Sequence, residues 1–383
     1  MDLENLRKAF PITEKAIFLN HAAISPSPTP VIEECRKWLV HNKMYGDMYF
    51  PNLGEILEGI DSDRRLVGKF INAQFPEEEI AFTYNTSYGL AAIAEAIKWE
   101  KGDKIVINDL EYTSNSYTYQ ALANKFGLLL EVIPNVRGAL PLESFAHKID
   151  QATRLVAVSH VQFSNGFRIN LNELSKICHE KNAHLMVDAI QSLGAIPMDV
   201  QKQDIDYMAS GGYKWLLGPL GTGFIYIKKD LAELLNPSFV GSMSDANPLE
   251  LSHHQHSPAH GAKRFQASLG PHTFLLAKAV EFLDNLGIEN IFAHIMKLTD
   301  LILEIVEKEN NYHLNTPIEN KGQRSGIINF SCPNGDKIVD QLRKLSKPIA
   351  ISYRKGGLRL SPHCYNTEEE IQTCLETIKT HTR

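Results

Sequence analysis

The run Ser210-Gly211-Gly212-Tyr213-Lys214-Trp215 places a lysine 26 residues after the aspartate that closes the apolar stretch His184-Leu185-Met186-Val187-Asp188. A lysine amine can form a Schiff base with an aldehyde. A carboxylate can hold a proton on a pyridine nitrogen, so that the ring withdraws electrons from a bound substrate carbon. Pyridoxal phosphate (PLP) chemistry needs both groups. The pair therefore predicts a PLP site that contains Lys214 and Asp188.

Strand-like apolar runs alternate with amphipathic helical stretches from about residue 65 to residue 230. Short β-rich runs separated by helices indicate an α/β fold, with a mainly parallel sheet covered on both faces. Ligands in such sheets bind at the carboxyl ends of the strands, where both Asp188 and the Lys214 run are expected. We expect strands over Lys104–Asn108, Leu128–Pro134, Arg154–Val161, His184–Asp188, Ile205–Ala209 and Gly223–Lys228, and helices over Thr113–Phe126 and Leu171–Asn182.

The remainder of the chain has a different character. Residues 236–272 are rich in Pro, Ser, His and Gly and are predicted to form a loop. A second unit is expected to follow, with helices over Thr273–Leu286, Ile291–Glu309 and Thr367–Lys379 and strands over Gly326–Phe330 and Ile349–Tyr353. Thr367-Glu368-Glu369-Glu370 has the form of a capping box. The expected domains are an N-terminal segment 1–30 packed with the small domain, a large domain 31–285 and a small domain 286–383.

The composition argues against several classes of partner. The 383 residues carry a formal net charge of −6, which does not favour nucleic acid or anionic membranes. The N-terminus lacks a signal pattern, and no stretch approaches the ~18 apolar residues of a membrane span. We therefore expect a soluble cytoplasmic protein that binds neither nucleic acid nor membrane.

Neither the cysteines nor the histidines form a convincing metal or disulfide pattern. The odd number and the scattered spacing of the cysteines predict reduced packing residues rather than a disulfide framework or a zinc site. They are Cys35, Cys178, Cys332, Cys364 and Cys374. Four histidines cluster in the 236–272 loop, at His253, His254, His256 and His260. Because no cysteine or acidic residue has matching spacing, we interpret this cluster as a polar loop and expect no metal.

Other polar residues are candidates for holding the cofactor. Thr86 and Ser87 begin a predicted helix after an apolar run, as a phosphate-binding site requires. The hydroxyl of Tyr213 can reach the same phosphate, and Tyr112 can stack on the ring from a loop after a strand. The amide of Gln191, three residues beyond the aspartate, can donate to the phenolic oxygen. Several of these residues also have a plainer alternative role. Thr86 and Ser87 would be helix N-caps, Tyr213 a packing residue, and Gln191 an N-cap or turn residue.

An amino-acid substrate carries a carboxylate, and a guanidinium is its preferred partner. Arg354 and Arg359 are the candidates, although most arginines are solvated surface residues. The segment 160–166 is predicted to face the substrate side chain through Asn165, Gln162 or Ser164. The identity of the amino acid depends on this segment and on loops 40–55 and 236–272.

From Phe18 to Ile378 the chain resembles the class V aminotransferase-fold enzymes, which include cysteine desulfurases, cystine and cysteine-sulfoxide lyases, kynureninases and isopenicillin-N-epimerase-like proteins. The resemblance rests on ordered motifs: Phe18-Leu19-Asn20-His21-Ala22-Ala23, Asn85-Thr86-Ser87, Ser159-His160-Val161, Val187-Asp188-Ala189-Ile190-Gln191-Ser192, Gly211-Gly212-Tyr213-Lys214-Trp215-Leu216-Leu217-Gly218-Pro219-Leu220-Gly221-Thr222-Gly223 and Arg359-Leu360-Ser361-Pro362-His363-Cys364-Tyr365-Asn366-Thr367.

The resemblance implies PLP fold type I (aspartate-aminotransferase-like), with a large domain around a mainly parallel sheet and a smaller α+β C-terminal domain. It also implies a homodimer whose active site lies near the subunit interface. By the same resemblance Lys214 is the Schiff-base lysine, Asp188 pairs with the pyridinium and Gln191 with the phenolic oxygen. Tyr112 falls at the ring-stacking position and Arg359 at the carboxylate-binding arginine.

Two departures from the family pattern bear on the reaction. Desulfurases of this shape carry a nucleophilic cysteine between the two arginine motifs, whereas this chain has only residues 355–358 there, and Cys364 follows Arg359. This argues against a persulfide-forming desulfurase. The motif by which relatives bind the phosphate of the partner subunit is also altered. Relatives often have Phe-Glu-x-Gly-Thr, whereas this chain reads Phe265-Gln266-Ala267-Ser268-Leu269-Gly270 and lacks the threonine hydroxyl. Any hydrogen bond to the partner's phosphate must therefore come from Ser268 or from the backbone.

Several reactions fit this site. A carbon–sulfur or β-elimination lyase and an aminotransferase are the leading alternatives, followed by an isopenicillin-N-epimerase-like epimerase. A PLP-binding protein without catalysis is opposed by Arg359, since a cofactor store needs no clamp for a substrate carboxylate. A last alternative is an α/β protein whose lysine is only structural.

Overall fold

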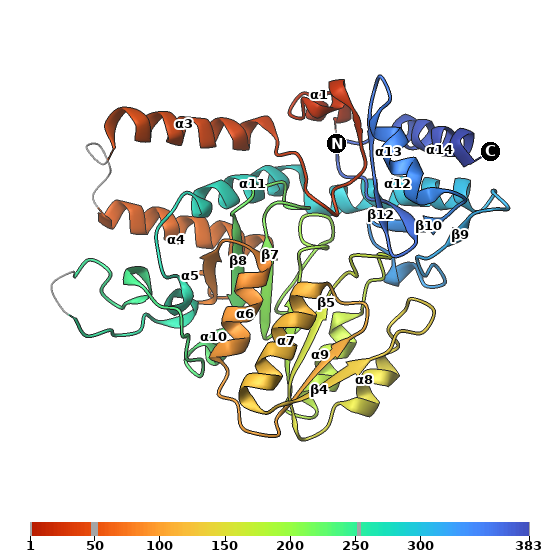
Figure 1. Cartoon of the computed structure of the whole chain (residues 1–383). Coiled ribbons are helices and arrows are strands. Elements are labelled where there is room, and N and C mark those ends of the chain that lie inside the picture. Colours follow the sequence, from red (N-terminus) through yellow and green to blue (C-terminus); the bar gives the residue numbers. More distant parts are fainter. Residues whose placement is uncertain (1, 47–52, 251–253, 383) are drawn as a thin grey trace.

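The computed structural model describes residues 2–46, 53–250 and 254–382, and its centre is a seven-stranded sheet (Figure 1). The strand order is β2-β8-β7-β6-β5-β3-β4. Only β8 runs antiparallel to its neighbours, which confirms the predicted mainly parallel sheet. The bounds are β2 Ile80–Thr83, β3 Lys104–Asn108, β4 Leu129–Ile133, β5 Thr153–Ser159, β6 His184–Asp188, β7 Tyr207–Gly211 and β8 Gly223–Ile227.

Helices cover both faces of the sheet (Figure 1). In β5, Leu155 and Ala157 join the apolar cluster on one face, and Val156 and Val158 join the cluster on the other. This period-two division explains why residues 155–158 are all apolar. The helices are α3 Thr29–Tyr45, α4 Leu53–Phe70, α5 Pro76–Glu79, α6 Thr86–Ala96, α7 Thr113–Phe126, α8 Leu142–Lys148, α9 Leu171–His179, α10 Lys229–Ala232 and α11 His272–Leu286. No helix in the described ranges is long and apolar enough to cross a bilayer.

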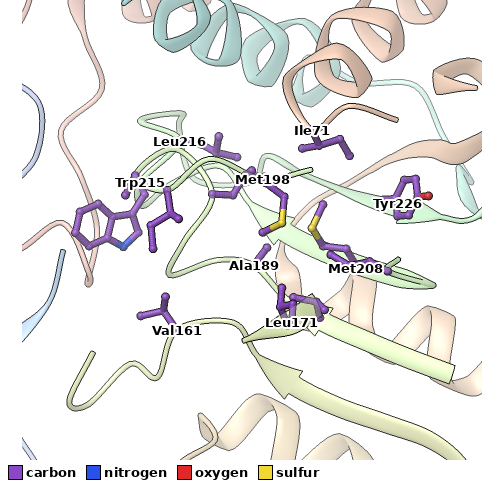
Figure 2. Close-up of a cluster of buried hydrophobic side chains, with 14 of the residues drawn as sticks. Ile71, Val161, Leu171, Ala189, Met198, Met208, Trp215, Leu216 and Tyr226 are labelled. Carbon is purple, nitrogen blue, oxygen red and sulfur yellow. The ribbon is translucent and has the colours of Figure 1, made fainter. Parts of the chain in front are cut away.

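The segment that carries Lys214 rests on this core. Trp215, Leu216, Met198 and Ala189 are buried in one cluster, and Figure 2 shows Leu216 near Met198 with Trp215 at the side of the cluster. A side chain at Gly212 would collide with Thr222 and Leu276, so the turn before the lysine requires glycine. The core therefore fixes the backbone on both sides of Lys214.

The C-terminal part forms a second sheet, β12-β13-β10-β9, and the N-terminal segment packs beside it (Figure 1). Strand β1 pairs with β11 in parallel, and Arg7 of α1 forms an ion pair with Glu370 at 2.9 Å. The predicted domain boundaries themselves stay a prediction. The remaining elements are α1 Leu3–Arg7, α2 Ile12–Lys15, β1 Ile17–Phe18, α12 Ile288–Val306, β9 His313–Leu314, β10 Ile328–Ser331, α13 Gly335–Arg343, β11 Ile349–Ala350, β12 Ser352–Arg354, β13 Gly357–Leu360 and α14 Glu368–Thr382.

Some predicted boundaries were wrong. Helix α9 ends three residues early, at His179, because the chain turns through Asn182 with a positive φ of 59°. Strand β7 starts two residues late, at Tyr207. The Leu185 N–H of the neighbouring strand donates to the buried Asp206 side chain, so it does not pair with the backbone there. The strand expected over Ile349–Tyr353 is divided between β11 and β12, and the 236–272 loop contains short 3-10 turns at Ser242–Ser244 and Gly261–Phe265.

The capping box before α14 is confirmed. Glu370 N–H donates to the Thr367 hydroxyl, and Thr367 N–H donates back to the Glu370 carboxylate, both at 3.1 Å.

Candidate active site

A pocket lies at the carboxyl ends of β5, β6 and β7, where the sheet predicts a ligand site. The structure brings together in it most of the residues proposed for the cofactor from the sequence. Its lining residues are Thr86, Ser87, Leu90, Tyr112, Ser114, Ser159, Phe163, Asp188, Ile190, Gln191, Tyr213 and Lys214. The individual role of each residue stays a prediction.

Asp188 and Lys214 are the charged pair of this pocket. Burial raises the pKa of Asp188, although the Ile190 N–H, at 2.9 Å from Oδ1, acts in the opposite direction. Burial lowers the pKa of Lys214, Asp188 raises it, and the positive charge of Arg359 lowers it again. A lysine with a lowered pKa carries a larger neutral fraction, which is the form that attacks an aldehyde or accepts a proton.

Aromatic rings flank the lysine amine. The Lys214 Nζ lies 5.8 Å from the ring centroid of Tyr112 and 5.9 Å from that of Tyr213. Phe163 contacts Tyr112 edge-on, with the two ring centroids 5.1 Å apart. The Tyr112 side chain is 47% exposed, so one face of its ring is free to cover a flat ligand. This position suits the predicted stacking role.

The N-terminus of α6 opens onto the same pocket. Asn85 is the N-cap, since its side chain accepts the Tyr88 N–H at 2.8 Å, so neither Thr86 nor Ser87 is needed as a cap. The Thr86 hydroxyl accepts the Gly211 N–H at 2.8 Å, and the Ser87 hydroxyl donates to Ser114 at 2.9 Å. Hydroxyls beside the positive end of a helix dipole fit a phosphate group.

Gln191 is held at both ends of its amide. Its Nε2 donates to the Ala22 carbonyl at 3.0 Å, and its Oε1 accepts the Trp215 indole N–H at 2.9 Å. Because Nε2 carries two hydrogens, one remains for the predicted bond to a phenolic oxygen.

Arg359 is a buried cation, 2% exposed. Its Nε donates to the Ser352 hydroxyl at 3.1 Å and its NH1 to the Phe163 carbonyl at 2.6 Å. Within the described part of the chain it has no acidic ion-pair partner. A buried cation without a counter-ion is costly, and a substrate carboxylate would supply the missing charge. Arg354 is exposed, and its NH1 donates to the Tyr353 carbonyl at 2.8 Å. Its positive charge lowers the pKa of Arg359 and of Lys214.

Several residues proposed from the sequence do not line the pocket, among them Arg354, Arg359, Asn165 and Ser268. Asn165 donates to the Gly138 carbonyl at 2.7 Å and accepts the Phe167 N–H at 3.1 Å, so local backbone holds both ends of its amide. The Ser268 hydroxyl lies 2.6 Å from the Tyr84 hydroxyl. Their proposed roles in substrate and phosphate binding stay predictions.

Three of the four clustered histidines lie in the described part of the chain, and His254 and His256 line the same surface pocket. His253 lies outside the described residues. His256 lies 3.4 Å from the Ser244 carbonyl, and His260 lies 2.8 Å from Glu233. Across the described ranges, no group of three or more His, Cys, Asp or Glu side chains is placed to hold a metal ion.

None of the five cysteines lines the pocket, and all five lie within the described residues. Cys178, Cys364 and Cys374 are buried, and Cys35 and Cys332 are half-buried. Burial raises the pKa of the Cys364 thiol, which keeps it protonated and poorly nucleophilic.

Sequence reasoning missed a group of buried polar residues behind Asp188. Glu111, Asn115 and Ser159 form one hydrogen-bonded cluster, in which Asn115 Nδ2 lies 2.6 Å from Glu111 and 3.5 Å from Asp188. Glu111 follows β3 and Ser159 ends β5. Both could have been identified from the sequence as site residues by the rule that ligands bind at the carboxyl ends of parallel strands.

The sheet, the lysine amine, the facing carboxylate and the helix N-terminus together define a PLP-dependent enzyme of fold type I. The family model described as Aminotransferase class-V matches residues 17–374, and the chain belongs to this family. A probable cysteine desulfurase of Pyrococcus abyssi is 31% identical, and the alignment covers 98% of this chain and 96% of that relative.

Solved structures agree with this family. The apo structure of a cysteine desulfurase from Thermococcus onnurineus NA1 has a TM-score of 0.89 at 27% identity, covering 99% of this chain and 98% of that one. The cystine C–S lyase C-DES shows the same fold, with a TM-score of 0.87 at 24% identity over 96% of this chain and 98% of that one. In another C-DES structure glycine is covalently linked to the PLP cofactor.

Proposed function

We propose that this enzyme cleaves the carbon–sulfur bond of a small sulfur-containing L-amino acid by β-elimination, without forming a persulfide on the protein. The observation that carries the proposal is a pocket that Lys214 lines and no cysteine lines. The buried, uncompensated Arg359 lies next to it and donates to the carbonyl of the lining residue Phe163. The cysteine desulfurases and the cystine C–S lyase among the similar proteins support a sulfur amino acid as the substrate.

In this proposal each residue has a defined task. PLP supplies an electron sink for the pair left at the substrate Cα. Arg359 binds the substrate carboxylate, and Lys214 Nζ accepts the Cα proton. Asp188 holds a proton at the ring nitrogen. With L-cysteine the net reaction consumes one water and yields pyruvate, ammonia and hydrogen sulfide.

Transamination begins with the same proton transfer and is the second candidate. A 26% identical protein of Bacillus subtilis carries the name "Uncharacterized aminotransferase YcbU". The two reactions differ in whether a β-substituent leaves before the proton returns, so they are separated by their products.

A product screen tests the proposal. The purified enzyme with PLP is incubated with L-cysteine, L-cystine and L-alanine, with and without a keto-acid acceptor. We expect sulfur release and pyruvate in equal amounts from a sulfur amino acid, independent of the acceptor. Keto acid that forms only with the acceptor would establish transamination, and alanine together with protein-bound sulfur would establish desulfuration. A D-amino acid product would establish epimerisation, and the absence of any product would indicate a PLP-binding protein without catalysis.

We also propose that the enzyme is a homodimer whose active site lies near the interface. Exposed apolar side chains support this: Tyr112 at the pocket, and Leu39, Val40 and Met44 on α3. Light scattering of the purified protein, expected to give twice the chain mass, tests it.

A further inference from the structure

Glu111 is a buried carboxylate, 6% exposed, that precedes Tyr112. Its Oε1 accepts the Asn108 amide at 2.5 Å and the Ser159 N–H at 2.7 Å. Its Oε2 accepts the Asn115 amide and the Ser159 hydroxyl, both at 2.6 Å. Among the described residues it has no cationic partner, so Glu111 is a buried anion that neutral donors stabilise.

One of these donors connects Glu111 to Asp188. The Asn115 Nδ2 lies 2.6 Å from Glu111 Oε2 and 3.5 Å from Asp188 Oδ2, and the Asn115 side chain is only 1% exposed. Two buried carboxylates thus share one amide. Burial raises the pKa of Asp188, and the charge of Glu111 raises it further.

We propose that Glu111 is a positioning residue for the PLP ring, which holds Asp188 in place through Asn115 and supplies a second negative charge that keeps a proton on the ring nitrogen. The inference rests on the proposed pairing of Asp188 with that nitrogen, but it does not depend on which reaction follows. Glu111 itself does not line the pocket.

Electrostatics gives the reason. A proton between Asp188 and a pyridine nitrogen is attracted by both carboxylates, and Coulomb forces act strongly in a buried site. A single carboxylate behind the ring would stabilise the protonated ring less. The same four close hydrogen bonds hold the loop that presents Tyr112 to the ring, so one side chain sets both the charge and the geometry of the site.

The test compares two ligands that differ only at the ring nitrogen. The apo forms of the wild type and of Glu111→Gln are titrated with PLP and with the 1-deaza analogue, in which carbon replaces that nitrogen. Glu111→Gln keeps the shape but removes the charge. We expect it to weaken PLP binding about tenfold, which corresponds to one pKa unit at the ring, and to change analogue binding much less.

Two further variants keep the test decisive. Asn115→Ser keeps both charges but removes the amide that holds Asp188. It therefore tests the positioning role alone and is expected to weaken PLP binding more than analogue binding, by a smaller factor than Glu111→Gln. Because Glu111 is unchanged in it, this variant also serves if Glu111→Gln does not fold. Ser159→Ala removes one donor but keeps the charge, so its effect is expected to be similar for the two ligands. Equal weakening of both ligands by Glu111→Gln, or no weakening, overturns the proposal. Because the readout is binding, failure of the lyase assay leaves this result unaffected.

Discussion

The indole Nε1 of Trp215 lies 2.9 Å from the Oε1 of Gln191, so the residue after Lys214 is bonded to the segment that follows Asp188. The same Gln191 amide donates to the Ala22 carbonyl of the N-terminal segment. Three segments that are far apart in the sequence are thereby joined beside the pocket by buried hydrogen bonds.

Replacing Trp215 with Phe tests this connection. The variant keeps an aromatic ring but leaves the buried Gln191 Oε1 without its donor, which costs about 1–3 kcal/mol. We expect the free energy of unfolding, measured in urea, to fall by that amount, and the affinity for PLP to fall with it. Trp99→Phe is the matched control, since Trp99 donates to the Ala94 carbonyl from a half-buried position. Equal losses of PLP affinity in the two variants would contradict the connection.

Lys214 is expected to be the residue that binds PLP covalently. Borohydride reduction of the enzyme with PLP, followed by peptide mapping, should place the pyridoxyl group on Lys214, because this lysine lines the pocket and its lowered pKa leaves more neutral amine. Lys104 provides an internal control, as it is also buried but donates to the Lys148 carbonyl and pairs with Asp150. A tag at any other position would refute the assignment.

Arg359 is expected to bind the substrate carboxylate. Arg359→Lys keeps a positive charge but loses the guanidinium fork. Since a hydrogen bond to a charged group contributes about 1.5–3 kcal/mol, KM should rise about 10- to 150-fold, while PLP absorbance is retained. The matched variant Arg354→Lys changes an exposed residue, and its KM should rise much less. Similar KM values for both variants would remove Arg359 from this role.

The sequence predicted the framework of the site because each main element carries a local signal. The strand that ends at Asp188 has the apolar centre Leu185-Met186-Val187. The turn before Lys214 contains Gly212, where a side chain would collide with Thr222. The start of helix α6 could be expected from Asn85-Thr86-Ser87. The helix packs closely against the sheet because residue 89 is glycine, where a Cβ would lie 2.6 Å from the Ile225 side chain. The local sequence pattern was therefore sufficient to predict each element of the site that a single segment forms.

The rest depended on contacts between distant segments. The hydrogen bonds of Glu111 join residues up to 51 positions apart, and the bond from Arg359 to the Phe163 carbonyl spans 196 positions. Asn165, predicted from the sequence to bind the substrate, bonds to the Gly138 carbonyl 27 positions away and to the Phe167 N–H. No periodicity records such pairings, because they are set by how segments distant in the chain pack together.

His179 predicts a pH dependence of stability outside the pocket. Its ring lies 2.8 Å from Asp206 and 3.0 Å from Asp204, and the hydrogen bond to Asp206 is the largest cause that raises its pKa. A raised folded-state pKa stabilises the protein fully below the unfolded value of 6.5, and this contribution is lost as the pH rises through the folded-state pKa. His179→Gln should therefore lower the unfolding free energy more at pH 5.5 than at pH 9.

Urea titrations of both proteins at the two pH values measure this difference. A His179→Gln effect that is equal at both pH values, or larger at pH 9, would show that the two aspartates do not stabilise the imidazolium.

The cysteines distinguish β-elimination from a persulfide mechanism. A persulfide enzyme needs a thiolate at the substrate sulfur, yet no thiol lines this pocket, and burial raises the pKa of Cys332 to about 11. Cys332→Ala and Cys35→Ala are therefore expected to release sulfur from the substrate within ~2-fold of the wild-type rate, as substitutions away from a site usually do. Cys364→Ala should lose some stability, because it opens space in the core, but should keep turnover below its unfolding temperature. The contrary result is a cysteine variant that stays folded and binds PLP but no longer releases sulfur, together with a 32 Da increment (about one sulfur atom) on the same cysteine of the wild type in mass spectrometry. That result would restore the desulfurase mechanism and would require the chain around that cysteine to reach Lys214 during turnover.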